Sequence, residues 1–191
     1  MTNFMTRAWV VGNVMSTQKT VLQAAGTVEE NGLRIDVEKA EQIVDALNAD
    51  LAAVYVLYHQ LRKHHWNVEG AEHRDLHLFL GEAAEEVDEI ADELAERAQA
   101  IGGVPVASPA ALQEASPVEP EDEDVYDIRT SLGHDLEMYG DVIESTREHV
   151  ELAENLGDHA TAEILRQGLV DMEEHAHTID HYLEEDTLVV D

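Results

Sequence analysis

The chain has 191 residues, of which 44% are hydrophobic, so we expect one domain with a substantial core rather than a disordered chain. It contains no cysteine, which excludes disulfides, thiol nucleophiles and zinc-cysteine sites. No apolar run approaches the roughly 18 residues that a membrane span needs. The opening MTNFMTRAWVVGNVM, with Met5 and Met15 as alternative starts, has too little positive charge for a signal peptide. We therefore expect a cytoplasmic protein.

The charge is extreme, because 42 acidic residues stand against 11 basic ones and give a formal net charge of −31. Direct nucleic-acid binding is not expected, since phosphate binding needs clustered cations. The acidity has two compatible interpretations. We favour a halophilic protein, because the screening length falls to about 3 Å at 1 M salt and an acidic surface then tolerates its own repulsion. The other is a field that attracts metal cations.

The first half of the chain predicts two long helices. Residues 1–35 lack a periodic apolar pattern and are interpreted as a variable N-terminal tail. Asp36 is a plausible N-cap for a helix over 37–67, whose apolar residues recur at intervals of three and four. Gly70 breaks this helix. A second helix is predicted over 73–101, where Gly102-Gly103 ends it.

The second half predicts a short helix and two further long ones. Ser108-Pro109 resembles an N-cap and first-turn proline, which favours a short helix over 109–115. An acidic loop follows, then helices over about 125–155 and 158–185, with Asp158 capping the last and 186–191 as a short C-terminal tail. With no convincing strand, residues 36–185 predict an all-α, ferritin-like four-helix bundle. The short helix lies in the long crossover between the second and third helices.

Four residues of the first two helices have the chemistry of metal ligands. His65 and His77 lie on either side of Gly70, and Asp92 and Glu96 are four apart on one helical face. Imidazole nitrogens with carboxylate oxygens suit iron or a similar divalent metal. A run this long cannot easily fold its carboxylate end back onto its histidine end, so such a site would need two copies of the chain. The alternative for each of the four residues is an ordinary solvated or hydrogen-bonded side chain that binds no metal.

A ferritin-type centre inside one bundle is incomplete. It would need a glutamate on two helices and Glu-x-x-His on the other two. The last helix offers Glu174-x-x-His177, but the second has Glu93-x-x-Glu96 instead. The first helix has no acid between Asp50 and Glu69. His59 and His64 are expected to be structural.

A multi-part motif spans more than thirty residues of this region. It consists of H-W-N-x-x-G, L-H, D-x-x-x-E-R and a glycine pair followed closely by proline. The matching residues are His65-Trp66-Asn67, Gly70, Leu76-His77, Asp92, Glu96-Arg97, Gly102-Gly103 and Pro105. This motif, with the helix pattern of residues 36–184, resembles the Dps family of mini-ferritins.

The resemblance implies a hollow homo-dodecamer with ferroxidase sites between two-fold-related subunits. His65 and His77 would come from one chain, and Asp92 and the bridging Glu96 from its partner. The implied reaction is oxidation of Fe(II), usually by hydrogen peroxide and otherwise by oxygen, with ferric mineral stored inside, which would protect DNA from oxidative damage. Trp66 would intercept stray oxidising equivalents beside the site. The alternative for Trp66 is an aromatic packed at a dimer contact.

Two residues depart from the family pattern. Gly81 stands where the family often has an aspartate, so the second iron would be weaker, bound by water, or served by Glu82 or Glu85. His73 stands where an aromatic is usual. It shares a helical face with His77, so it is either an extra ligand or, as we favour, a polar replacement at a packing position.

Further residues are candidates for moving or collecting iron. The family's entry channel lies near the turn between the third and fourth long helices, which here is ENLGDHATAE, so Glu154, Asp158, His159 and Glu163 are candidates. The alternative for Asp158 is helix capping. His175, His177 and His181 on the last helix would bind iron at secondary sites or be ordinary surface histidines.

Two other functional classes remain. The first is a nucleoid-associated protein that binds DNA directly, but family members that do so commonly carry a lysine-rich tail. This chain has only Arg7 and Lys19 in its first thirty residues. The second is a helical bundle without catalysis, which would show no iron-dependent absorbance.

Overall fold

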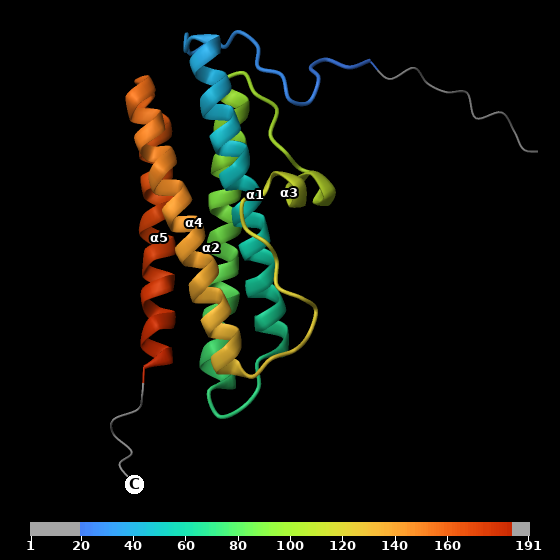
Figure 1. The fold of residues 1–191 in the computed structure, drawn as a ribbon, viewed down its shortest axis with the longest axis vertical. Coiled ribbons are helices and arrows are strands. Elements are labelled where there is room, and N and C mark those ends of the chain that lie inside the picture. Colours follow the sequence, from blue (N-terminus) through green and yellow to red (C-terminus); the bar gives the residue numbers. More distant parts are fainter. Residues whose placement is uncertain (1–19, 185–191) are drawn as a thin grey trace, which may run out of the picture.

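The computed structural model describes residues 20–184, which contain five helices and no strand. Four are long and one is short (Figure 1). The helices are α1 (Val37–Asn67), α2 (His73–Ala100), α3 (Pro109–Ala115), α4 (Ile128–Leu156) and α5 (His159–Leu183). The predicted all-α bundle with a short helix in the central crossover is confirmed.

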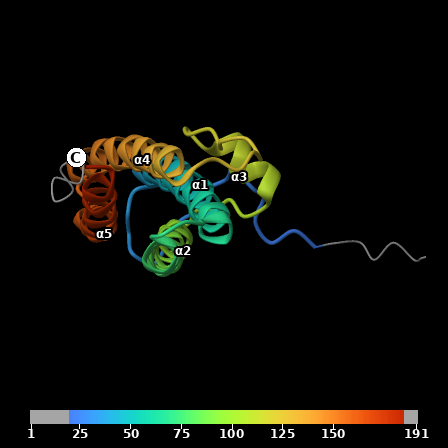
Figure 2. The same ribbon diagram turned by 90° about the horizontal axis from the view of Figure 1, so that it is seen from below.

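The long helices pack as two antiparallel pairs joined by the crossover. Helix α1 packs against α2 and α4, and α5 packs against α4 and α2. Between α2 and α4 the chain runs back along the bundle and carries α3, which packs on the outer side of α1 (Figures 1 and 2). This connection places residues 116–127 beside the C-terminal half of α1.

The core follows the predicted apolar periodicity. On α1 the side chains at intervals of three and four are all no more than 1% exposed, namely Ile43, Leu47, Leu51, Val54, Leu57 and Leu61. Burying each such side chain stabilises the fold by roughly 1.5–3 kcal/mol. None of the helices in residues 20–184 has an apolar stretch long enough to cross a membrane.

Side-chain caps fix where the helices begin. Asp36 accepts a hydrogen bond from the Glu38 amide, as predicted for the start of α1. The start of α4 was predicted near residue 125 and is wrong by three residues. Asp127 is the N-cap, because its carboxylate accepts from the Thr130 amide at 3.1 Å and from the Thr130 hydroxyl at 2.7 Å. Val125 therefore stays outside the helix, 64% exposed.

The glycine pair after α2 anchors the N-terminal segment as well as ending the helix. Residues 20–35 contain no helix, and residues 1–19 and the predicted C-terminal tail lie outside the described range. The carbonyl of Gly102 accepts hydrogen bonds from the Glu29 amide at 2.9 Å and from Gln23 Nε2 at 2.8 Å. Gly102 has φ +95°, and a Cβ there would lie 2.2 Å from the Glu29 carbonyl oxygen. Only glycine therefore permits this close approach.

Candidate metal centre

His65 and His77 form a stacked pair between the last turn of α1 and the second turn of α2. Their ring centroids are 3.9 Å apart and their planes differ by 18°. His65 Nδ1 lies 2.7 Å from the His77 carbonyl oxygen, and His77 Nδ1 lies 2.9 Å from the His65 carbonyl oxygen. A carbonyl oxygen only accepts, so each Nδ1 carries a hydrogen and donates. In the neutral form of each ring this leaves the lone pair on Nε2, and that form is the one that binds metals.

Gly81 makes room for this stack. It is buried on α2, one turn after His77. A Cβ at position 81 would lie 3.0 Å from His65 Cε1 and 3.1 Å from His65 Nδ1, closer than ordinary van der Waals contact. An aspartate here would have to displace the His65 ring. The departure from the family pattern at Gly81 is therefore coupled to the position of His65.

We expect Gly81→Ala to weaken divalent-cation binding about tenfold, because moving a group that supports a metal ligand typically costs 10- to 100-fold. The fold should survive, since alanine favours a helix over glycine by about 1 kcal/mol. The measurement is a Zn²⁺ titration of the assembled protein. Gly140→Ala is the matched control, because a Cβ at this helical glycine of α4 meets nothing within 4 Å. Equal affinities in the two variants would contradict the expectation.

Asp92 and Glu96 are exposed on α2, far from the histidines of the same copy. At 1.5 Å per residue they lie about 22 Å and about 28 Å along the helix from His77. Burial, and then the negative charges of Asp88 and Asp92, raise the pKa of Tyr55 on the neighbouring α1. Within residues 20–184 no group of three or more His, Asp or Glu side chains is placed to hold a metal ion. In one copy the four predicted ligands are thus two separate pairs.

Trp66 and His73 flank the histidine pair. Trp66 is 67% exposed, and the guanidinium of Arg62 lies 5.8 Å from its ring centroid. His73 Nδ1 donates to the Val68 carbonyl at 2.9 Å, and its ring centroid is 5.3 Å from that of His77. His73 therefore fastens the loop between α1 and α2. Its predicted role as an extra ligand stays a prediction.

The candidate channel residues differ in how far their side chains are engaged. Asp158 caps α5 through the Thr161 amide, as its capping alternative predicts. Its two carboxylate oxygens also lie 2.7 Å from Arg97, and only 7% of the residue is exposed. Although burial opposes it, the hydrogen bonds from Arg97 and Thr161 lower the pKa of Asp158. A carboxylate held in this way is poorly suited to passing cations along a channel.

The other channel candidates, Glu154, His159 and Glu163, are exposed. Glu154 forms an ion pair with Arg166, which also lies 3.9 Å from Glu163. One arginine thus sits between two of the proposed acidic residues. Their role in cation entry stays a prediction.

The histidines of α5 fall into two environments. His177 and His181 are exposed, with their Nε2 atoms 3.2 Å apart. His175 is buried instead, and its Nε2 lies 2.7 Å from a carboxylate oxygen of Glu86 and its Nδ1 3.1 Å from the Tyr139 hydroxyl. It forms part of the wall of an acidic groove of about 560 Å³ between α2 and α5. The expected secondary iron sites on this helix stay predictions.

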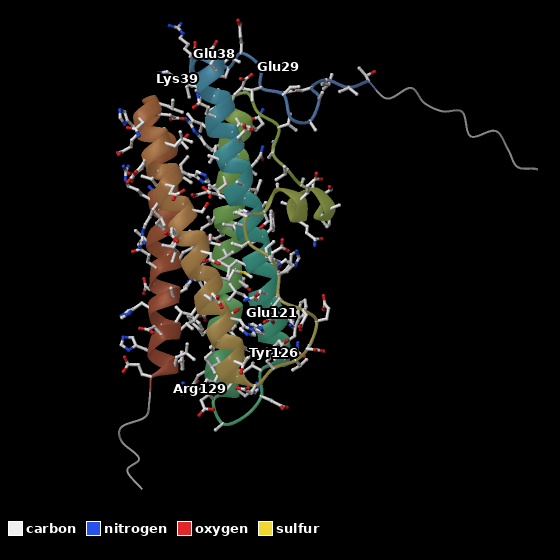
Figure 3. All side chains as sticks on the ribbon, in the orientation of Figure 1. Glu29, Glu38, Lys39, Glu121, Tyr126 and Arg129 are labelled. Atoms are coloured by element: carbon white, nitrogen blue, oxygen red, sulfur yellow. The ribbon has the colours of Figure 1, made fainter. Side chains whose placement is uncertain are left out.

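Sequence reasoning missed a partly buried ionic cluster around Glu121. This residue of the crossover lies against the C-terminal half of α1 (Figure 3). Its carboxylate contacts Lys63, His64 and His134. No local signal could have found it, because Glu121 sits in an acidic loop more than fifty residues from α1. His64, expected to be structural, is indeed buried and hydrogen-bonded.

The comparisons with known proteins agree with this architecture. The family model described as a ferritin-like domain matches residues 44–189. A relative called DNA protection during starvation protein, from Halobacterium salinarum, is 70% identical over 92% of this chain and 97% of its own length. A nutrient stress-induced DNA-binding protein from Synechococcus is 37% identical over 90% of this chain and 98% of its own length.

Solved structures show the same likeness. The crystal structure of an archaeal Dps homologue from Halobacterium salinarum superposes with a TM-score of 0.87 at 70% identity, covering 92% of this chain and 98% of that one. The Dps protein of Vibrio cholerae, described as a member of a broad superfamily of ferritin-like diiron-carboxylate proteins, has a TM-score of 0.77 at 26% identity. That alignment covers 85% of this chain and 99% of the Vibrio chain.

Proposed function

Since this chain belongs to the Dps family of ferritin-like proteins, we propose that it oxidises Fe(II), with hydrogen peroxide or oxygen as electron acceptor, and stores the ferric product in a hollow shell of twelve copies. Such a protein would protect DNA by removing iron and peroxide together. The observation that carries the proposal is the stacked pair His65 and His77, each fixed at Nδ1 with Nε2 left to bind a metal.

The ligand set is complete only if two copies contribute to it. In the proposed site, His65 and His77 of one copy face Asp92 and Glu96 of the partner subunit across a two-fold axis. Neutral imidazoles and carboxylates together suit Fe(II), and the two negative charges offset part of the charge of the bound ions. An isologous contact of this kind creates two equivalent sites per pair of copies.

The chemistry that these residues must support is a two-electron step. One hydrogen peroxide accepts one electron from each of two Fe(II) ions, its O–O bond breaks, and with two waters the products are two FeO(OH) units and four protons. Glu96 of the partner subunit is the proposed bridging carboxylate that holds both ions. Trp66, exposed and adjacent in sequence to His65, would intercept a stray oxidant or cover the site at the subunit contact.

The test mixes metal-free protein with anaerobic Fe(II) and then peroxide, and follows the growth of ferric absorbance. We expect His65→Ala and Glu96→Ala each to lower the initial rate at least about tenfold, since losing a ligand should cost no less than losing one of its supports. His59→Ala is the matched control, an exposed histidine of α1 outside the proposed ligand set. Rates in the two site variants equal to that of the control would refute the site.

The name of the Synechococcus relative favours a second candidate, direct binding to DNA. The charge of −31 opposes it, because DNA and protein would repel each other. Gel-shift experiments with metal-free protein at increasing salt separate the two. Retardation that weakens as salt rises would favour direct binding, and none at any salt would favour protection through iron chemistry.

A further inference from the structure

The carboxylate of Glu121 holds three side chains from two different helices. Its Oε1 lies 2.6 Å from Lys63 Nζ and 2.6 Å from His64 Nε2, both on α1. Its Oε2 lies 2.6 Å from His134 Nδ1 on α4. Only 11% of the Glu121 side chain is exposed. Charge-assisted hydrogen bonds this short and this sheltered are stronger than neutral ones at the surface.

His64 is held at both ring nitrogens. Opposite Glu121, its Nδ1 lies 2.9 Å from both carboxylate oxygens of Asp135, a residue of α4 with no exposed surface. Asp135 also accepts from Gln60 Nε2, one turn earlier on α1, at 3.0 Å. A ring whose two nitrogens both donate to carboxylates cannot turn without breaking a bond. The last turns of α1 are thereby fixed to α4 and to the crossover.

This anchored turn is the one that carries the histidine pair. His65 follows His64 directly, and successive residues of a helix point about 100° apart. One side of the turn therefore faces the acidic anchors while His65 faces His77. The His65 carbonyl, which orients His77, belongs to the same turn. Because the last four carbonyls of a helix have no partner within it, such a turn depends on contacts from outside for its position.

We propose that Glu121 is a positioning residue for the metal half-site, acting through His64 on the place of His65. The inference rests on the proposed function, since it takes His65 as a metal ligand. Glu121 touches neither the metal nor its ligands. It fixes the turn of α1 that carries His65, just as hydrogen-bond partners outside the ligand set orient a metal-bound histidine.

The test measures Co²⁺ binding to the assembled, metal-free protein, without iron or oxidant, from the visible absorbance of the bound ion. Glu121→Ala is expected to weaken binding about tenfold. Glu121→Gln, which keeps the shape and one acceptor oxygen but not the charge, should weaken it less. Glu123→Ala is the matched control, an exposed acid two residues away on the same loop, and should bind as the unchanged protein does.

A double-mutant cycle separates positioning from general destabilisation. In a His65→Ala background, Glu121→Ala should have no further effect on Co²⁺ affinity, because the residue through which it acts is gone. Affinity equal to that of Glu123→Ala, or an unchanged loss in the His65→Ala background, would overturn the proposal. If Glu121→Ala does not assemble, Glu121→Gln is compared instead with Glu123→Ala and is measured in the His65→Ala background. Wild-type protein that binds Co²⁺ but does not oxidise Fe(II) would refute the proposed function and leave this result standing.

Discussion

Shells that mix two inactive variants are expected to recover Fe(II) oxidation. One variant carries His65→Ala and His77→Ala, and the other carries Asp92→Ala and Glu96→Ala. Each alone lacks one half of every site. Where the two variants meet at a two-fold contact, one of the two sites combines an intact histidine pair with an intact carboxylate pair, and the other has neither.

The size of the recovery follows from the symmetry. In a random one-to-one mixture half of the contacts join unlike variants, so about a quarter of the sites are intact and about a quarter of wild-type activity should return. The variants are co-expressed with different affinity tags, and shells that carry both tags are isolated before the rate is measured. No activity above that of the separate variants would contradict a site shared between copies.

A matched mixture tests whether the recovery comes from pairing of halves. Shells mixed from single variants His65→Ala and His77→Ala contain no copy with an intact histidine pair. They should remain as inactive as either variant alone, although their expression, tags and assembly are the same. Recovery in this control would mean that mixing restores something other than the proposed site.

The limits of the helices could be predicted because their signals are local. Asp36 caps α1 through an amide only two residues away, and a periodic apolar face runs along the helix to Leu61. The start of α4 was misplaced because Val125, apolar and close to the periodic face, resembles a helical residue. The carboxylate of Asp127 fixes the start of α4, and its hydrogen bond from the Thr130 amide is likewise local.

The candidate site could be predicted only in part. The ligand types and their spacing are visible in the sequence, and so is the difficulty of joining them within one chain. The stack of His65 on His77 is not visible, and neither is the need for Gly81 beneath it. Glu121 reaches α1 over more than fifty residues, so nothing near it in the sequence marks its role. These contacts depend on how the helices pack, which periodicity does not specify.

The second large effect concerns pH. At constant high salt, metal-free protein is expected to be most stable between about pH 4.5 and 6.5, the ordinary pKa values of glutamate and histidine, and to lose stability on either side. On the acid side, despite opposing burial, hydrogen bonds from Lys63 and His134 lower the pKa of Glu121. A carboxyl with a lowered pKa stabilises the fold above its ordinary value. That stability is lost as pH falls through the lowered one.

On the alkaline side the relevant groups are Asp50 and His149. Asp50 on α1 has no exposed surface, and one of its carboxylate oxygens has no hydrogen-bond partner in the described part of the chain. His149 Nδ1 on α4 donates to the other oxygen at 2.8 Å. This hydrogen bond raises the pKa of His149, and burial raises the pKa of Asp50. Folding therefore favours the protonated form of both groups. The contribution of His149 is full below pH 6.5 and declines as pH rises, whereas that of Asp50 already declines above pH 3.8, the ordinary value of its pKa.

The pKa of His64 is also raised: burial opposes the shift, but the hydrogen bonds to Asp135 and Glu121 outweigh it. Removing His149 should therefore reduce the loss of stability above pH 6.5 without abolishing it. His149→Gln is expected to have a lower melting temperature than the wild type at pH 6 and a smaller further loss between pH 6 and 8.5. For a chain of this size each 1 kcal/mol corresponds to about 2–4 °C.

Thermal unfolding in concentrated KCl measures this, because high salt screens the repulsion of the −31 charge and leaves the buried pairs largely unscreened. His159→Gln is the control, because this histidine is exposed, and its melting temperature should change with pH as that of the wild type does. If the melting temperature of His149→Gln also changed with pH as that of the wild type does, the pair of His149 with Asp50 would not be a source of the pH dependence. The loss of stability above pH 6.5 would then have to come from His64 or from the surface charge. Repeating the thermal unfolding at a second salt concentration distinguishes these two sources, since only the surface charge responds strongly to screening.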